Sequence, residues 1–256
     1  MFRAITVILA FIFVANMANA AETIHHKMTI TLDPATHQLN ATDTITIPAS
    51  LAKDGMILQI NSDLNVEKIA GTVTLEKTAK GRNAKDIGID RDNDKKDTII
   101  KVSHYKLHGI KSGQPATLTL KVSGMINNPV IQLNEEYARG FSQSPGLIEE
   151  RGVYLAGATY WVPTVKDTLI TYDITVKMPA DWRSVSQGER LKHETGDFHE
   201  DRWKATTPTE EIYLIAAKFT EYEIPVGNVK AMAFLRTPDD AMANKYLETT
   251  AQYMEM

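Results

Sequence analysis

Apolar and polar residues alternate with a period of two along much of this chain, a pattern that predicts strands with one buried face. The alternation is clearest in four runs, at residues 24–32, 39–47, 118–122 and 170–178. The turn between the first two runs is Asp33-Pro34-Ala35-Thr36, where Pro presets φ and Asp can accept a nearby backbone hydrogen bond. We therefore predict a β-hairpin over residues 24–47.

Shorter strand candidates surround four further pairs of apolar residues: Leu58 and Ile60, Ile100 and Val102, Tyr213 and Ile215, and Ala231 and Ala233. Proline and glycine fall between these runs, and no helical pattern of 10–15 residues separates one strand from the next. The pattern favours a mainly β fold, an antiparallel β-sandwich or saddle-like sheet domain, over residues 21–236.

Two stretches interrupt the alternation. Residues 79–98 are polar and charged, which predicts a long hairpin tip or an inserted loop. Residues 127–152 contain Asn-Asn-Pro and Ser-Pro-Gly sequences, which predict an irregular connection inside the sheet domain. A linker between two domains is the alternative for the second stretch.

The pattern changes to a helical one at the end of the chain. Thr237-Pro238-Asp239-Asp240 is typical of a helix start, with Thr237 as cap and Pro238 in the first turn. Apolar residues then recur on one face up to Met256, where no capping residue follows. We predict a helix over 237–256 that begins a following, helical catalytic domain. The alternative is a terminal helix that docks on the sheet.

The first 20 residues have the features of a secretory signal peptide. One arginine precedes an apolar run of about a dozen residues, and Ala18-x-Ala20 provides the small residues of a cleavage site. An uncleaved anchor is the alternative. We expect a periplasmic or secreted protein, with no membrane span after cleavage because no later segment is long and apolar enough.

The composition excludes several kinds of binding partner and active site. The 256 residues include 28 basic and 32 acidic residues, and the formal net charge of −4 argues against a nucleic-acid partner. Cysteine is absent, which excludes thiolate catalysis, cysteine-bound zinc and disulfides. With 43% hydrophobic residues, the chain can form a core without such supports.

Histidines and carboxylates give no recognisable active site. His193-Glu194 and His199-Glu200 are His-Glu pairs, but neither continues to the His-Glu-x-x-His of a zinc-binding helix. Both pairs lie in a polar stretch that predicts a hairpin tip. Asp90-x-Asp92-x-Asp94 begins like a calcium loop, yet lacks the required Gly and Glu, which indicates a solvated turn. We therefore predict no catalytic residue, metal ligand or cofactor in this chain.

Several motifs occur together in an order that resembles the N-terminal β-domain of aminopeptidase N-type (gluzincin) zinc metallopeptidases. A Leu-Asp-Pro turn between two strands comes first, and aromatic, Met-Pro, Thr-Thr-Pro and Tyr-Leu-x-Ala motifs follow. In this chain they are Ile30-Thr-Leu-Asp-Pro34, Tyr160-Trp161-Val162-Pro163, Tyr172-Asp-Ile-Thr-Val-Lys-Met-Pro179, Val185-Ser186-Gln187-Gly188, Trp203, Thr206-Thr207-Pro208 and Tyr213-Leu214-Ile215-Ala216.

The resemblance implies a non-catalytic domain, truncated before the catalytic domain of a secreted metallopeptidase. It would shape the substrate cleft for peptide hydrolysis, with its own catalytic domain and a peptide as partners. Zinc would be bound in the missing domain, so the chain alone is expected to bind no stoichiometric zinc and cleave no amino-acid anilide. Tyr160 and Trp161 are the candidates for substrate contact, a buried core position being their alternative.

Two other functions are compatible with the sequence. The chain could be a complete periplasmic β-sandwich module that binds a protein or a glycan, again through Tyr160 and Trp161. It could also be a self-contained hydrolase with a carboxylate or histidine site that the motifs do not reveal.

Overall fold

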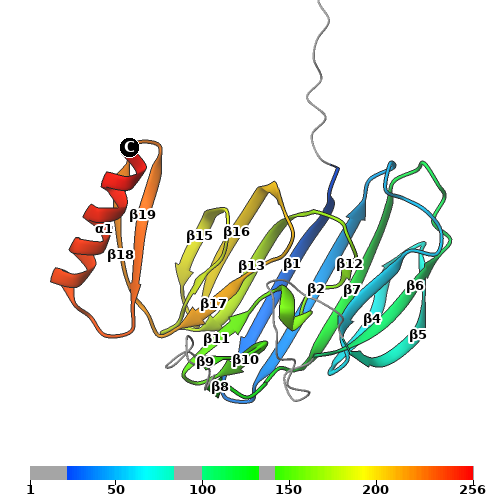
Figure 1. Ribbon diagram of the computed structural model, residues 1–256, viewed down its shortest axis with the longest axis horizontal. Helices are drawn as coiled ribbons and strands as arrows, with labels where there is room; N and C mark the ends of the chain where they lie inside the picture. Colours follow the sequence, from blue (N-terminus) through cyan, green and yellow to red (C-terminus); the bar gives the residue numbers. More distant parts are fainter. Residues whose placement is uncertain (1–21, 84–99, 133–141, 256) are drawn as a thin grey trace, which may run out of the picture.

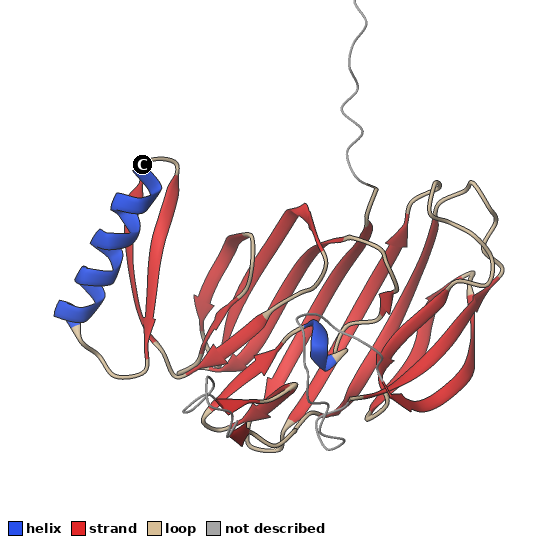
Figure 2. Ribbon diagram, viewed as in Figure 1, coloured by secondary structure: helices blue, strands red, loops and turns tan. Residues whose placement is uncertain are grey.

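The structure, a computed structural model, describes three segments of the chain: residues 22–83, 100–132 and 142–255. The predicted signal peptide, with Ala18 and Ala20, lies outside the described residues, as does the Asp90-x-Asp92-x-Asp94 turn. Strands make up most of the described chain and the α-helix comes last (Figure 2), which confirms the mainly β prediction.

The largest sheet has seven strands in the order β15-β16-β13-β1-β2-β7-β4 (Figure 1). Its strands are β1 (Ile24–Asp33), β2 (Gln38–Ile47), β4 (Leu64–Gly71), β7 (Ala116–Met125), β13 (Ile170–Pro179), β15 (Glu189–Thr195) and β16 (Phe198–Thr209). The predicted hairpin is confirmed as β1 and β2, whose turn is closed by the Ala35 N–H donating to Asp33 Oδ1 at 3.1 Å. All four clear runs of alternation are strands of this sheet.

One pairing in this sheet is parallel. β1 pairs with β13 in parallel, from Ile24 opposite Ile170 to Thr31 opposite Lys177, whereas the other pairs of described strands are antiparallel. The paired residues are 146 positions apart in the sequence, and parallel neighbours need a long crossover connection. Local alternation contains no signal for such a pairing.

Two four-stranded sheets cover the inner face of the large sheet. They are β12 (Thr164–Val165), β3 (Ile57–Asn61), β6 (Lys101–His108) and β5 (Thr74–Asn83), and β10 (Gly146–Glu149), β11 (Gly152–Leu155), β17 (Leu214–Ala217) and β14 (Arg183–Val185). Buried apolar residues from all three sheets form a single cluster, in which Ile30, Leu107 and Leu214 are fully buried. This is the packing of a β-sandwich with one core.

The last strands and the helix form a separate unit at one end of the molecule (Figure 1). The hairpin β18 (Thr220–Val226) and β19 (Val229–Leu235) packs against α1 (Asp240–Glu255) around Val226, Ala231 and Leu247. The helix thus docks on its own hairpin and leaves Met242 and Tyr246 exposed on another face.

The helix start differs from the prediction. The cap is Asp239 in place of Thr237, because Asp239 Oδ1 accepts the Met242 N–H at 2.9 Å and the Asp239 carbonyl accepts the Ala243 N–H. Pro238 precedes the cap, and α1 begins at Asp240. A carboxylate three residues before a free helical N–H satisfies that donor directly.

The interrupted stretches are only partly described. Residues 79–83 belong to β5, and the remainder of the first stretch lies outside the described residues. The second stretch includes β8 (Ile131–Gln132) and β9 (Ser142–Gln143), which pair with each other in a two-stranded sheet, and β10, which belongs to one of the four-stranded sheets. Among the described helices, none has the length and apolar character that a membrane span requires.

Candidate functional site

A pocket of about 470 Å³ opens beside the loop that contains Tyr160 and Trp161. The segment from Tyr160 to Ile170 forms most of its lining, and residues 210–212 close it from another strand connection. Three carboxylate side chains, Asp167, Glu210 and Glu211, line the pocket together with Lys166. The pocket therefore combines an apolar wall with an excess of negative charge.

Tyr160 is held in an unusual backbone conformation at the edge of this pocket. It follows the short 3-10 helix η2 (Gly157–Thr159) with φ 51° and ψ 38°, in the left-handed region that non-glycine residues rarely adopt. Its N–H donates to the Gly157 carbonyl at 2.9 Å and its carbonyl accepts the Asn61 N–H at 2.8 Å. These bonds fix the residue, whose half-buried ring faces the pocket and whose phenol pKa is raised by burial.

Trp161 is a buried core residue, which was the alternative to substrate contact. Its side chain is only 1% exposed, and its indole Nε1–H donates to the Ile212 carbonyl at 3.1 Å. A buried indole with its N–H satisfied stabilises the fold beneath the pocket. Of the two predicted contact residues, Tyr160 is the one whose side chain a ligand can reach.

Glu211 organises the opposite side of the pocket. Its carboxylate accepts the Gly157 N–H and the Tyr213 hydroxyl, the latter at 2.7 Å. The hydrogen bond to Glu211 raises the pKa of Tyr213 to about 12. A Cβ at Gly157 would meet Glu211 Oε2, so a larger residue here would require the Glu211 side chain to move away. Gly157 and Glu211 are 54 residues apart in the sequence, and no local motif predicts their contact.

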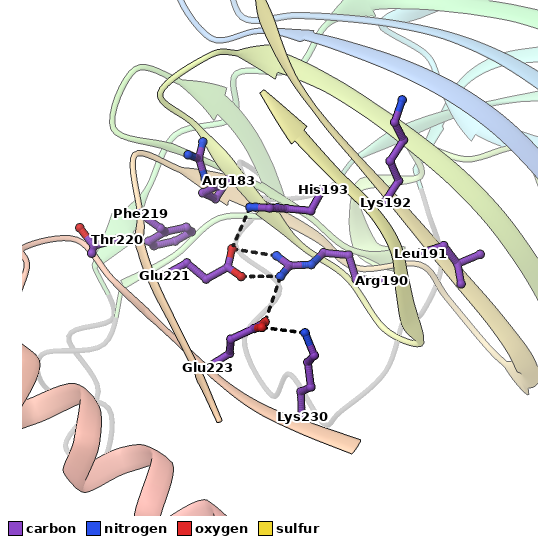
Figure 3. A pocket seen from close by; sticks show the side chains of 10 residues that line it. All are labelled: Arg183, Arg190, Leu191, Lys192, His193, Phe219, Thr220, Glu221, Glu223 and Lys230. Atoms are coloured by element: carbon purple, nitrogen blue, oxygen red, sulfur yellow. Dashed lines mark hydrogen bonds and ion pairs between the residues drawn. The ribbon is translucent and has the colours of Figure 1, made fainter. Parts of the chain in front are cut away.

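A second pocket, of about 730 Å³, lies where the sandwich meets the β18–β19 hairpin (Figure 3). Arg190 of β15 donates to both oxygens of the Glu221 carboxylate of β18 through its terminal nitrogens Nη1 and Nη2, and it also contacts Glu223 at 3.5 Å. Lys230 of β19 contacts Glu223 at 2.6 Å. Alternating charges thus join the two parts of the molecule across this pocket.

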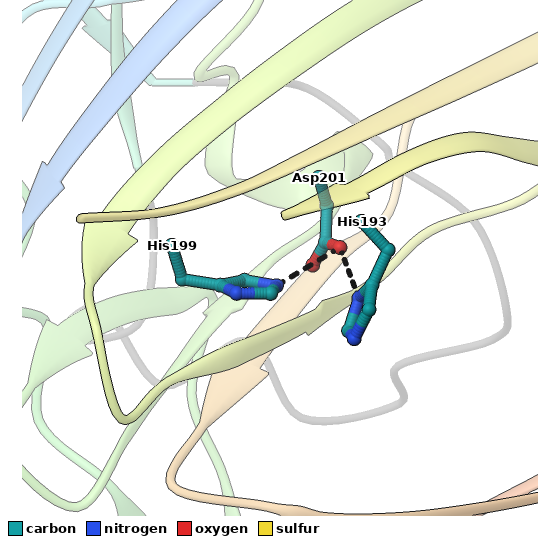
Figure 4. A group of neighbouring side chains, drawn as sticks. All are labelled: His193, His199 and Asp201. Carbon is teal, nitrogen blue, oxygen red and sulfur yellow. Dashed lines mark hydrogen bonds and ion pairs between the residues drawn. The ribbon is translucent and has the colours of Figure 1, made fainter. Parts of the chain in front are cut away.

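His193, which lines the second pocket, belongs to a polar cluster on the β15–β16 hairpin (Figure 4). The predicted hairpin tip is confirmed, and its register places His193 opposite Asp201. His199 precedes Asp201 by two residues, which puts both on the buried face of β16. Asp201 Oδ1 lies 2.8 Å from His193 Nδ1 and 3.1 Å from His199 Nε2.

Burial and hydrogen bonding set the charge states in this cluster. Burial lowers the pKa of His199, and the nearby Asp201 only partly opposes that effect. Burial by itself would raise the pKa of Asp201, but hydrogen bonds from Ser184 and His193 lower it below its usual value. The cluster therefore favours a carboxylate beside a neutral His199 ring.

In the sequence, these two histidines lie in a predicted hairpin tip and do not match the helical zinc motif, which gave no sign of their shared contact with Asp201. Once residues 189–209 are placed in a hairpin, the cross-strand pairing of His193 with Asp201 becomes predictable. The contact with Ser184 of β14 is a tertiary one and needs the packed sandwich.

No family model and no curated protein matches this sequence. Solved structures of M1 zinc metallopeptidases do share its fold. A point mutant of the enzyme from Deinococcus radiodurans aligns with a TM-score of 0.53 and 13% identity, over 88% of this chain and 52% of that chain. A complex of that mutant with a Tyr-Ser-Ala substrate gives the same values. A further structure of the enzyme gives 0.52 and 14%, over 87% and 51%.

These comparisons confirm the predicted resemblance at the level of the fold. The domain is a β-sandwich of the kind found in M1 zinc metallopeptidases, and it spans about half the length of those structures. The zinc-binding His-Glu-x-x-His is absent from these 256 residues, so the chain does not contain the residues of that zinc site.

Proposed function

We propose that this chain is the non-catalytic N-terminal β-domain of a secreted zinc metallopeptidase of the aminopeptidase N type. The observation that carries the proposal is the fold shared over 88% of this chain with about half of an M1 zinc metallopeptidase. The order of motifs from Ile30 to Ala216 supports the same family. Zinc and the glutamate that activates its water would belong to the remaining part of the enzyme.

In this proposal the Tyr160 pocket contributes one wall of the substrate cleft. The half-buried Tyr160 ring offers an apolar surface, and Glu210 and Asp167 offer negative charge at the same pocket. A peptide with a free amino terminus carries the complementary positive charge. The expected reaction of the whole enzyme is hydrolysis of a peptide at that end.

The catalytic domain would be the main partner of this domain. The helix α1 covers its hairpin with Leu247, but Met242, Tyr246 and Tyr253 remain 45%, 53% and 73% exposed. Large apolar side chains grouped on one helix are typical of a surface that another domain covers. The predicted signal peptide supports export of the protein to the periplasm or beyond.

The reading frame after codon 256 provides the direct test. We expect it to continue into a segment that encodes His-Glu-x-x-His and a downstream Glu. The longer protein should hydrolyse amino-acid anilides, and a Glu→Gln change in that motif, as the matched control, should abolish hydrolysis. A stop codon at this point in a verified gene, or a following segment without zinc ligands, would refute the proposal.

A further inference from the structure

We propose that His193, His199 and Asp201 form a binding site for a divalent transition-metal ion, with zinc as the ion that best matches the donors. The set consists of two imidazole nitrogens and one carboxylate oxygen, a combination common in zinc sites with one open position. The three donor atoms lie within 4.8 Å of one another (Figure 4). The site is unrelated to the metal site of the peptidase family and does not depend on the proposed function.

The distances suit an ion at the centre of the cluster. Ligand atoms about 2.1 Å from a tetrahedral zinc are about 3.4 Å from one another. Asp201 Oδ1 is already 2.8 Å from His193 Nδ1 and 3.1 Å from His199 Nε2. Small rotations of the side chains would replace these two hydrogen bonds by three bonds to the ion.

The other polar atom of each buried ligand is already held. His199 Nδ1 lies 2.7 Å from Thr195 Oγ1, and Asp201 Oδ2 accepts the Ser184 N–H at 3.0 Å and its hydroxyl at 2.7 Å. Outer contacts of this kind orient metal-binding side chains and select the tautomer. They leave His199 Nε2 and Asp201 Oδ1 directed toward the proposed ion.

His193 completes the set from the partly exposed side. Its Nδ1 faces Asp201, and its Nε2 lies 3.9 Å from Glu221 Oε2, a carboxylate that can stabilise the ring when Nδ1 binds a cation (Figure 3). Two arginines line the pocket at this side: Arg190, which Glu221 and Glu223 balance, and Arg183. The carboxylates of Asp201, Glu221 and Glu223 lie beside these two positive charges and favour a bound divalent ion.

The second pocket supplies access to the site. The His193 side chain is 36% exposed and lines this cavity of about 730 Å³, whereas His199 and Asp201 are fully buried. An ion that enters there would gain three protein ligands and keep one position for water or another ligand. The bound ion would stabilise the β15–β16 hairpin tip. Through the contact of His193 with Glu221, it would also stabilise the adjoining strand β18.

Zinc titration of the 256-residue chain tests the proposal. The protein should carry no polyhistidine tag, and EDTA should be removed by dialysis before calorimetry with zinc chloride. We expect one zinc per chain in the wild type. His193→Gln should weaken binding by more than about 100-fold, since loss of an outer-shell contact alone costs about 10–100-fold.

His108→Gln is the matched control, because His108 has the same 36% side-chain exposure and also pairs with a carboxylate, 2.7 Å away. This variant should bind zinc like the wild type. Thr195→Val should weaken binding by about tenfold through the orientation of His199. Far-UV circular dichroism verifies that every variant is folded.

Cobalt binding to the wild-type protein provides a spectroscopic test that needs no variant. Cobalt bound by two imidazoles, a carboxylate and water in a tetrahedral site should produce intense visible absorption that one equivalent of zinc removes. The proposal is overturned if the wild type binds no stoichiometric zinc, if His193→Gln and His108→Gln bind equally well, or if cobalt shows no such band. Binding would replace the sequence-based expectation that this chain takes up no zinc.

Discussion

His26 and Asp43 form a buried pair inside an otherwise apolar core. They face each other on the inner side of β1 and β2, 1% and 0% exposed, with His26 Nδ1 2.8 Å from Asp43 Oδ2. Asp43 Oδ1 has no hydrogen-bond partner among the described residues. The position interrupts the alternation of the second run, where an apolar residue would fit the pattern. A polar pair at this depth makes each member strongly dependent on the other.

Replacement of one member of this pair should be more harmful than replacement of both. We expect His26→Leu to lower the free energy of unfolding by about 3–5 kcal/mol, because it leaves the Asp43 carboxylate buried and unpaired. The double variant His26→Leu/Asp43→Leu should recover most of that loss. Urea unfolding of the three proteins measures the difference. Equal destabilisation in both variants would show that the pair itself contributes the stability.

A pair on the outer face predicts a dependence on pH. Arg202 donates to both oxygens of Asp173, and this hydrogen bonding lowers the pKa of Asp173. A carboxylate with a lowered folded-state pKa contributes stability above its unfolded pKa of about 3.9, and this contribution is lost as pH falls through the folded value.

Asp173→Asn should therefore destabilise the protein by up to about 1 kcal/mol at neutral pH, the range of partly exposed ion pairs. The difference from the wild type should shrink as the pH falls below about 3.9, because the wild-type carboxylate then also becomes protonated. Denaturant unfolding at a series of pH values checks this. Asp197→Asn, in the exposed hairpin turn, is the control and should show no such trend. A stability difference between the wild type and Asp173→Asn that increases in acid would contradict the role assigned to the Asp173 carboxylate.

At the scale of elements, local signals identified the clearest strands and the terminal helix, but they missed strands such as β4 and β18 and placed some element ends wrongly. The β1–β2 hairpin was predicted from alternation and a turn, both of which act between near neighbours. The start of α1 was placed at Thr237, yet the structure gives the cap to Asp239. Thr237, Pro238 and Asp239 are all residue types that occur at the cap or in the first turn of a helix. The Asp239 N–H also donates to the Tyr222 hydroxyl of β18, a contact that sequence neighbours do not reveal.

The cap assignment can be tested with two alanine variants. Asp239→Ala should lower the stability of α1 by about 1 kcal/mol, since the Met242 N–H loses its acceptor. Thr237→Ala should have little effect, because Thr237 is exposed and precedes the cap. Thermal melting followed by the helical circular dichroism signal measures both. A larger loss of stability for Thr237→Ala than for Asp239→Ala would indicate that Thr237 is the cap.

At the scale of the whole molecule, one core joins three sheets, and a smaller core joins the last hairpin to α1. The two parts meet through charged contacts such as that of Arg190 with Glu221, at the pocket that the proposed metal site shares. At 13% identity the shared sandwich depends on apolar periodicity more than on particular side chains. This explains how a fold can be common to proteins whose sequences differ so widely.

The sequence by itself determined the β class, the hairpin over residues 24–47, the main strands and a terminal helix. These features follow from periodicity and turn chemistry, which act over a few residues. Only the tertiary structure decided the parallel pairing of β1 with β13, the burial of Trp161 and the contact of Glu211 with Gly157. It also brought Ser184 against Asp201. Such contacts join segments far apart in the chain, and packing of the sheets selects them from many alternatives that local propensity cannot distinguish.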